Sequence, residues 1–447
     1  MGLRQEEWWT LYTGDISMAL TGDSFIANRI SAHAQPEYLR LFEIIRAHDI
    51  GFTNLEFLLN DFKGTPAAQS GGTYAGAWRR IVDDLSWAGF QFISRANNHA
   101  LDYSYTGLRL TSKTLDEAGL THAGVGEDLA QARAPSYRET AKGRVALLSA
   151  CSTFAPWGRA GQRRPDFVGR PGLSPLRYET VYRAPPEELE RLGELERRLG
   201  LHHAEKKRRQ FSYRKGEDEE ITSFAGLRFA PGPEYRVETR PHAQDVEDIL
   251  KYIRDARRQS DWVLFSLHAH ESQLESHLPA DFIVSFARRC VEAGADVFIG
   301  HGPHLLRGIE IYQGKPIFYS LGNFFFQNDL VERQPQEIYD QYRLGPEATV
   351  ADLYDRRSQK DQVGFPSDPV YWETVLALLR WKQGALTGVE LVPVSLGYGK
   401  PRSQRGRPVV ATGSEAVAIL DRLAELSGPW GTEMHIQNER GRLVLGN

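Results

Sequence analysis

The sequence has few cysteines and no long apolar stretch. Its 447 residues include only Cys151 and Cys290, which lie far apart in the chain. This number excludes a disulfide framework and favours a reducing compartment. No apolar run approaches the roughly 20 residues of a membrane-spanning helix. The first residues lack the basic and apolar regions of a signal peptide. We therefore expect a cytoplasmic protein without a membrane span.

The sequence also lacks a strong excess of either charge. It has 54 Lys and Arg against 58 Asp and Glu, so its formal net charge is −4. This balance argues against a surface for nucleic acid or lipid, and we expect no nucleic-acid partner. Hydrophobic residues make up 41% of the chain and charged residues 25%. These fractions are typical of a globular protein with an ample core.

Polar side chains gather where the predicted strands end. Apolar segments predict buried strands at residues 16–21, 51–56, 90–95, 145–151, 262–267, 295–299 and 316–326. Beside their ends stand Asp23, Asn54, Glu56, Asn97, Asn98, His99, Asp102, His268, His270, His301, His304 and Asn323. Open α/β sheets place their sites at such ends, so we predict that many of these side chains converge.

One strand end carries two histidines on a short loop. Gly300 and Gly302 allow the backbone to turn beside a ligand, and His301 and His304 offer imidazoles. Neutral imidazole is the commonest protein ligand of transition metals. A helix cap with a structural histidine is the alternative for this loop.

A second strand end carries an acid/base pair. His99 lies three residues before Asp102, and a carboxylate that holds an imidazole fixes its tautomer for proton transfer. Asn54 and Glu56 are two residues apart, so both leave their strand on the same face and together suit a cation. Turn and helix-cap roles are the structural alternative for Asp23 and Asp102.

The segment 155–240 differs in character from the predicted core. It is rich in Arg, Pro and Gly, and leucines at helical spacing between residues 185 and 200 predict a surface helix. The basic run 206–209 and the acidic run 217–220 predict exposed helices or a flexible arm. We predict a core at residues 1–330 that carries this insertion, a candidate lid or docking arm. Residues 331–447 form a C-terminal extension with loops, a β-hairpin and a helix.

Five motifs of the chain resemble one known family. They are Asn54-Leu-Glu56, Asn97-Asn-His-Ala-Leu-Asp102, Gly294-Ala-Asp, Gly300-His-Gly-Pro-His304 and Lys315-Pro-Ile-Phe-Tyr-Ser-Leu-Gly-Asn-Phe. Over residues 16–328 the chain resembles the CapA family, named for bacterial poly-γ-glutamate capsule synthesis. That family is similar to the calcineurin-like metallophosphoesterases. The resemblance implies an α/β fold, a two-sheet β-sandwich flanked by helices, here with a charged helical insertion.

The resemblance also implies a divalent metal ion. The predicted ligands of this ion are Asp23, Glu56, Asn98, His268, His270, His301 and His304. Of these, His270 is predicted from this sequence alone and the others from the resemblance. The calcineurin-like pattern has Asp-x-His at the first strand, whereas Ser24 and Phe25 follow Asp23 here, which favours one ion over two. Ca, Mn, Mg and Zn all remain candidates. We predict catalytic roles for His99, Asp102, Asp23 and His301, and substrate contacts for Asn54, Asn97 and Asn323.

Two kinds of reaction fit these residues. A metal ion can activate water for hydrolysis of a phosphoester or an amide. Alternatively, His99 with Asp102, and His301 or His304 with Asp23, move a proton at the carbon next to a carbonyl. CapA-like proteins also resemble epimerases that invert the C-terminal residue of lasso peptides. We therefore predict a metal-dependent isomerase, a peptide epimerase. A hydrolase, or a factor that binds a poly-γ-glutamate-like polymer, is the alternative.

Overall fold

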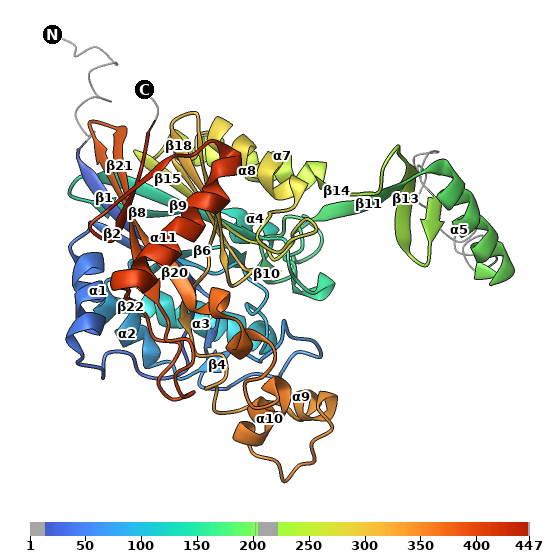
Figure 1. The fold of residues 1–447 in the computed structure, drawn as a ribbon, viewed down its shortest axis with the longest axis horizontal. Coiled ribbons are helices and arrows are strands. Elements are labelled where there is room, and N and C mark those ends of the chain that lie inside the picture. The colour runs from blue at the N-terminus through green and yellow to red at the C-terminus, as the bar shows by residue number, and fades with distance from the viewer. Residues whose placement is uncertain (1–13, 202, 204–221, 446–447) are drawn as a thin grey trace.

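Two β-sheets lie face to face, helices cover them, and an arm projects from one side (Figure 1). The computed structural model describes residues 14–201, 203 and 222–445. The two predicted charged runs, 206–209 and 217–220, lie outside the described residues. None of the described helices is long and apolar enough to cross a membrane.

The first sheet is built around β1 (Ile16–Phe25), which pairs in parallel with β2 (Ile50–Leu55). Its other strands are β5 (Phe92–Ser94), β6 (Thr121–Ala123), β19 (Asn323–Phe326), β20 (Glu373–Lys382), β21 (Ala385–Ser395), β22 (Val409–Val410), β23 (Met434–Gln437) and β24 (Arg440–Leu443). β5 and β6 extend the parallel side, and β20 lies antiparallel on the other side of β1. The predicted C-terminal hairpin is confirmed as β20 and β21, which continue this sheet.

The second sheet has a parallel centre with antiparallel edges. Its strands are β8 (Ser136–Thr140), β9 (Gly143–Cys151), β15 (Trp262–His268), β16 (Val297–His301), β17 (Leu306–Tyr312) and β18 (Lys315–Leu321). β9, β15, β16 and β18 run in parallel, whereas β8 and β17 close the edges. The parallel strands of both sheets therefore bring their carboxyl ends to one side of the sandwich.

Alternating side chains explain the apolar layers on both faces of each sheet. In β1, Met18 packs in the core between the sheets, and Ala19 packs against the outer helices. In β15, Trp262 lies between the sheets and Val263 faces outward. Strands that are buried on both faces read as continuous apolar runs, which is why the sequence predicted them.

Helices cover the two outer faces, with α1 and α2 over the first sheet and α7 and α8 over the second. The α-helices are α1 (Pro36–Arg46), α2 (Ile81–Ala88), α3 (Ser104–Glu117), α4 (Leu129–Arg133), α5 (Pro186–Arg198), α7 (Ala243–Arg257), α8 (Asp281–Glu292), α9 (Gln336–Gln341), α10 (Val350–Ser358) and α11 (Gly413–Ser427). The sequence predicted only loops where α9 and α10 lie. Helices of 6 and 9 residues are too short to show a clear apolar period.

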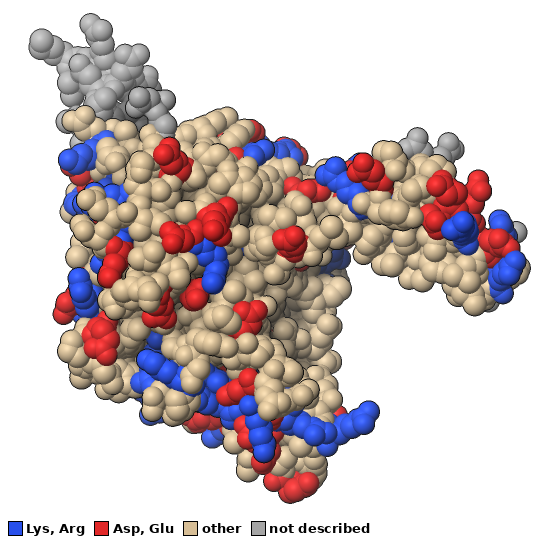
Figure 2. Space-filling view, viewed as in Figure 1, with Lys and Arg blue, Asp and Glu red and all other residues tan. Residues whose placement is uncertain are grey.

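The projecting arm holds α5 and a four-stranded sheet (Figure 1). The strands of this sheet are β11 (Tyr178–Ala184), β12 (Thr222–Phe224), β13 (Leu227–Pro231) and β14 (Arg236–Pro241). Two separate strand pairs lie outside this sheet: β3 (Leu58–Leu59) with β4 (Gly76–Ala77), and β7 (Val125–Gly126) with β10 (Gly172–Leu173). The predicted leucine-rich surface helix is confirmed as α5, none of whose residues is buried. Figure 2 shows acidic and basic side chains interspersed on the arm and on the body.

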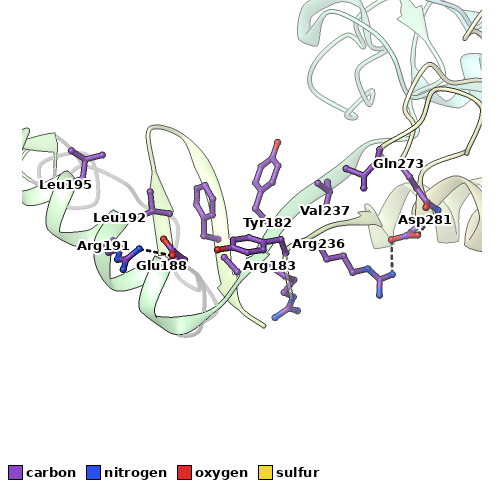
Figure 3. Close-up of a pocket in the computed structure, with 14 residues that line it drawn as sticks. Tyr182, Arg183, Glu188, Arg191, Leu192, Leu195, Arg236, Val237, Gln273 and Asp281 are labelled. Atoms are coloured by element: carbon purple, nitrogen blue, oxygen red, sulfur yellow. Dashed lines mark hydrogen bonds and ion pairs between the residues drawn. The ribbon is translucent and has the colours of Figure 1, made fainter. Parts of the chain in front are cut away.

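A groove of about 630 Å³ runs beside α5 on the arm. Figure 3 shows Leu192 and Leu195 of the helix on one side and Tyr182 and Val237 of the sheet nearby. At the base of the arm, the buried Asp245 carboxylate bonds to Arg177 and Arg133. The ion pair with Arg177 ties the start of the arm to α7, and the ion pair with Arg133 ties α4 to α7.

Candidate active site

Strand ends from both sheets meet at one place in the sandwich. Asp23 lies in the last part of β1, Glu56 directly follows β2, and His99 follows β5 in the first sheet. His268 ends β15 and His304 follows β16 in the second sheet. Their side-chain nitrogens and oxygens lie within 4 Å of at least one other member of this group. The predicted convergence of these strand ends is therefore seen in the structure.

Glu56 lies at the centre of this group. Its Oε1 atom is 3.9 Å from Nε2 of His99, 3.8 Å from Nε2 of His268 and 3.7 Å from Nε2 of His304. The side chain is fully buried, and neither of its oxygens has a hydrogen-bond partner. Burial, and then two neighbouring aspartates, raise the pKa of Glu56 well above its usual value. A buried carboxylate without a donor is costly, and a cation at this position would remove that cost.

His270 completes a set of atoms that fits a metal ion. Glu56, His270 and His304 each offer one donor atom, and these atoms lie within 4.8 Å of one another. Burial lowers the pKa of His270 well below its usual value, and it lowers the pKa of His304 to about 4. Both imidazoles are therefore neutral at pH 7, which is the form that binds metals. Two imidazoles with one carboxylate suit a divalent transition metal such as Zn or Mn.

Asp23 is held in place by donors from both sheets. Its Oδ1 accepts a hydrogen bond from Nδ2 of Asn54 at 2.7 Å, and its Oδ2 accepts one from the backbone N–H of Gly302 at 2.9 Å. Burial raises the pKa of Asp23, but the hydrogen bond and charge of His268 outweigh it, so the pKa is lowered. The Asp23 carboxylate lies 3.6 Å from Nδ1 of His268, where it can orient that ring.

The three asparagines that we predicted as substrate contacts bond to other protein groups. Oδ1 of Asn97 accepts from the backbone N–H of His99 at 3.1 Å, and its Nδ2 donates to Oδ1 of Asn54 at 3.3 Å. Oδ1 of Asn323 lies 2.9 Å from Nδ1 of His304. These bonds leave Nε2 of His304 facing Glu56, so the asparagines position the surrounding histidines.

Asn98, which we predicted as a metal ligand, lies beside the site. Its Oδ1 is buried and has no hydrogen-bond partner. A free amide oxygen is a suitable ligand for a hard cation. Asn98 therefore remains a candidate ligand, although it is not among the donors that lie closest together.

His301 lies one layer behind the group around Glu56. Its Nε2 is 2.8 Å from Oγ of Ser266, and its ring stacks on Phe52 with the ring centroids 5.7 Å apart. Burial lowers its pKa to about 4. The sequence predicted His301 as both ligand and catalytic group, yet its ring lies between the two sheets. The Nε2 contact and the stacking are those of a structural histidine, whereas the buried Nδ1 has no hydrogen-bond partner and stays a candidate ligand atom.

The predicted acid/base pair has the expected geometry. Nδ1 of His99 lies 2.7 Å from Oδ2 of Asp102, which also accepts a hydrogen bond from the backbone N–H of Ala75 at 2.7 Å. Nε2 of His99 is left to face Glu56. This arrangement favours the tautomer in which Nε2 can accept a proton.

Comparison with known proteins assigns the chain to a family. Residues 10–328 match the family described as bacterial capsule synthesis protein PGA_cap. The chain belongs to this family. The predicted resemblance to CapA proteins is thereby confirmed, and so is the predicted fold class, because the two-sheet α/β sandwich of this PGA_cap protein is the calcineurin-like fold.

Several relatives are similar to this PGA_cap protein. Two uncharacterized proteins of Sinorhizobium fredii, y4sH and y4uA, are each 38% identical over 445 residues, which cover 96% of this chain and 93% of theirs. The PGA biosynthesis protein CapA of Bacillus subtilis is 36% identical over 105 residues, 24% of this chain and 27% of that protein. The capsule biosynthesis protein CapA of Bacillus anthracis is 24% identical over 294 residues, 65% of this chain and 53% of that protein.

Two solved structures show a distant likeness to this PGA_cap protein. A hypothetical protein from Thermus thermophilus aligns with a TM-score of 0.39 at 10% identity, over 85% of this chain and 98% of its own. The NAD nucleotidase NadN of Haemophilus influenzae aligns with a TM-score of 0.31 at 8% identity, over 92% of this chain and 56% of its own.

Proposed function

We propose that this protein is a metal-dependent peptide epimerase, which removes and returns the proton at a peptide α-carbon. One observation carries the proposal. The buried, unpartnered Glu56 carboxylate, a candidate metal ligand, lies 3.9 Å from the free Nε2 of a histidine whose other nitrogen bonds to a carboxylate. A cation site and a general base thus share one buried space, an arrangement that suits proton abstraction next to a carbonyl.

Residues from both sheets would have distinct roles in this reaction. Glu56, His270 and His304 would hold the cation, which when bound supplies a Lewis acid for the substrate carbonyl. Nε2 of His99 takes the α-proton, and Asp102 stabilises the imidazolium that results. In place of the predicted pair of His301 or His304 with Asp23, His268 would return a proton to the opposite face, because its Nδ1 lies 3.6 Å from the Asp23 carboxylate.

A peptide substrate is supported by the relatives. The Bacillus relatives are named for PGA biosynthesis and capsule biosynthesis. Under this proposal a polymer or peptide joined by amide bonds is the substrate class. The carbonyl next to each α-carbon of such a chain is the group that a cation would polarise.

Hydrolysis is a second candidate, and one contact favours it. Asn98 offers an unpartnered oxygen beside the same cavity, and an oxygen-rich site can hold a hydrated ion whose water attacks a phosphoester or amide. In that reaction Nε2 of His99 would take a proton from the attacking water and pass it to the leaving group. A polymer-binding factor without chemistry is the third candidate.

Deuterium labelling separates these candidates. The protein, loaded with Mn²⁺, is incubated in heavy water with a panel of linear peptides, and mass spectrometry reads the products. An epimerase adds one deuteron at one α-carbon without cleavage, whereas a hydrolase shortens the peptide. The variant His99→Ala should lose the exchange and keep its metal, and His435→Ala, an exposed histidine on β23, should behave as the wild type. Binding with neither deuteration nor cleavage would refute both enzyme candidates.

A further inference from the structure

A cavity of about 260 Å³ opens directly beside the candidate site. Three of its lining residues, Asn98, Asp102 and His270, also belong to that site or touch it. The rest of the lining comes from two loops, residues 69–71 and 153–158, and from Leu101 and Leu173. Ligand pockets are typically roughly 300 to 1,000 Å³, so this space suits one residue of a longer substrate.

The wall that faces the site is aromatic and apolar. Phe154 and Trp157 are half-buried and pack against a small apolar cluster that includes Leu101 and Leu173. No Lys or Arg is among the described residues that line the cavity. Asp102 adds a carboxylate to the lining, so an acidic side chain would meet apolar surface and like charge there.

The aromatic wall is fixed relative to His270. Oγ of Ser152 donates to Glu271 at 2.6 Å, and Oγ1 of Thr153 donates to Glu271 at 2.9 Å. The backbone N–H of His270 donates to Oγ1 of Thr153 at 2.9 Å. Glu271 therefore anchors the loop that carries Trp157, and it positions the His270 backbone through Thr153. A side chain held in this cavity would keep a fixed distance from the candidate ligand.

The opposite wall approaches the site closely because it contains a glycine. A Cβ at Gly71 would lie only 2.3 Å from Nδ2 of Asn98. The bare backbone at Gly71 thus packs on the Asn98 amide, while Gln69 and Ser70 supply uncharged polar groups at the rim.

We propose that this cavity is the subsite for an uncharged side chain of the peptide, on the residue at or next to the reacting carbon. Trp157 and Phe154 select apolar or aromatic side chains, and none of the described lining residues is a Lys or Arg that could pair with a glutamate. This inference rests on the proposed function for the place of the reacting carbon. The selectivity itself is a binding property that can be measured without turnover.

Binding of short peptides tests this subsite. The metal-loaded protein is titrated with Ala-X-Ala tripeptides, in which X is Phe, Leu, Glu or Lys, and saturation-transfer NMR follows the ligand. The affinity for the Phe and Leu peptides should be at least about tenfold higher than the affinity for the Glu peptide. Trp157→Ala should weaken binding of the Phe peptide about tenfold. Tyr398→Ala, which removes an aromatic ring that is 46% exposed outside this cavity, should leave binding unchanged.

Two further measurements keep the outcome decisive. Gln69→Lys, a change at the exposed rim, should raise affinity for the Glu peptide several-fold without affecting the fold. His99→Ala should keep the same peptide preference. In the wild-type protein, this preference without deuterium exchange would refute the epimerase and leave the subsite standing. A preference for the Glu peptide, no binding of the Phe and Leu peptides, or full affinity in a folded Trp157→Ala variant would overturn the subsite.

Discussion

Gly302 and His270 fit together only because residue 302 has no side chain. A Cβ at Gly302 would lie 2.9 Å from Cδ2 of His270, and its φ of +116° is a conformation that other residues rarely adopt. The ring of His270, one of the candidate ligands, therefore occupies space that any other residue at position 302 would take. The same glycine donates its backbone N–H to Asp23.

Gly302→Ala should displace the His270 ring and the Ala269 backbone, because the added Cβ would lie 2.9 Å from atoms of each. We expect Mn²⁺ affinity, measured by calorimetry, to fall about tenfold or more, because one ligand leaves its position. Gly314→Ala is the matched control, since Gly314 also has a positive φ, +73°, but nothing lies within 4 Å of its Cβ position. Both variants should lose stability from backbone strain, and only Gly302→Ala should lose metal. Equal metal affinity in the two variants would show that His270 is not a ligand.

Metal binding should release a proton from Glu56. Because its pKa is raised well above the usual value, the metal-free carboxyl keeps its proton toward neutral pH, whereas metal binding needs the carboxylate. Calorimetry in buffers of different ionisation enthalpy should give up to about one proton released per ion at pH 6, and affinity should fall as the pH drops further. Glu56→Gln should lose tight binding and this release. Glu310→Gln, at a buried carboxylate that Arg288 partners, should retain both.

Asp102→Asn should reduce catalysis without removing the metal. The amide can still accept from Ala75, but it no longer stabilises an imidazolium at His99. We expect deuterium exchange at the peptide α-carbon to fall about 100-fold or more, with the metal content unchanged by elemental analysis. Asp116→Asn removes a second Asp–His contact, with His122 at 3.1 Å, outside the site and should keep full activity. Equal activity of Asp102→Asn and wild type would exclude His99 as the base.

Stability of the metal-free protein should fall in mild acid. Burial lowers the pKa of His301 from 6.5 to about 4. Between these values the unfolded chain binds a proton at His301 that the folded protein does not, so the free energy of unfolding decreases as the pH falls. Urea unfolding at pH 7 and pH 4.5 should show a loss on the order of 2 kcal/mol from this group. The free energy of unfolding of His301→Gln should fall less between pH 7 and pH 4.5. If the variant lost as much as the wild type, the burial argument would be contradicted.

Much of the fold was predictable because its signals are local. The apolar runs of β1, β15 and β16 reflect strands buried on both faces, and the leucine spacing of α5 repeats along a helix of 13 residues. The short helices α9 and α10 were missed, since few turns give little periodicity. The strand-end polar residues were also predictable, because parallel strands place such residues at one side of a sheet.

By itself, the sequence determined which side chains end the strands, and with them the pairing of His99 with Asp102 across three residues. Only the tertiary structure decided how these side chains are ordered in space. In the folded protein Glu56 lies among three histidines, and His301 contacts Ser266. The asparagines form hydrogen bonds with neighbouring protein groups. It also brought Trp157, from a loop with no periodic signal, to the wall of the cavity. The reason is that local pattern fixes the face on which a side chain leaves its strand, whereas its neighbours depend on how two separately formed sheets pack.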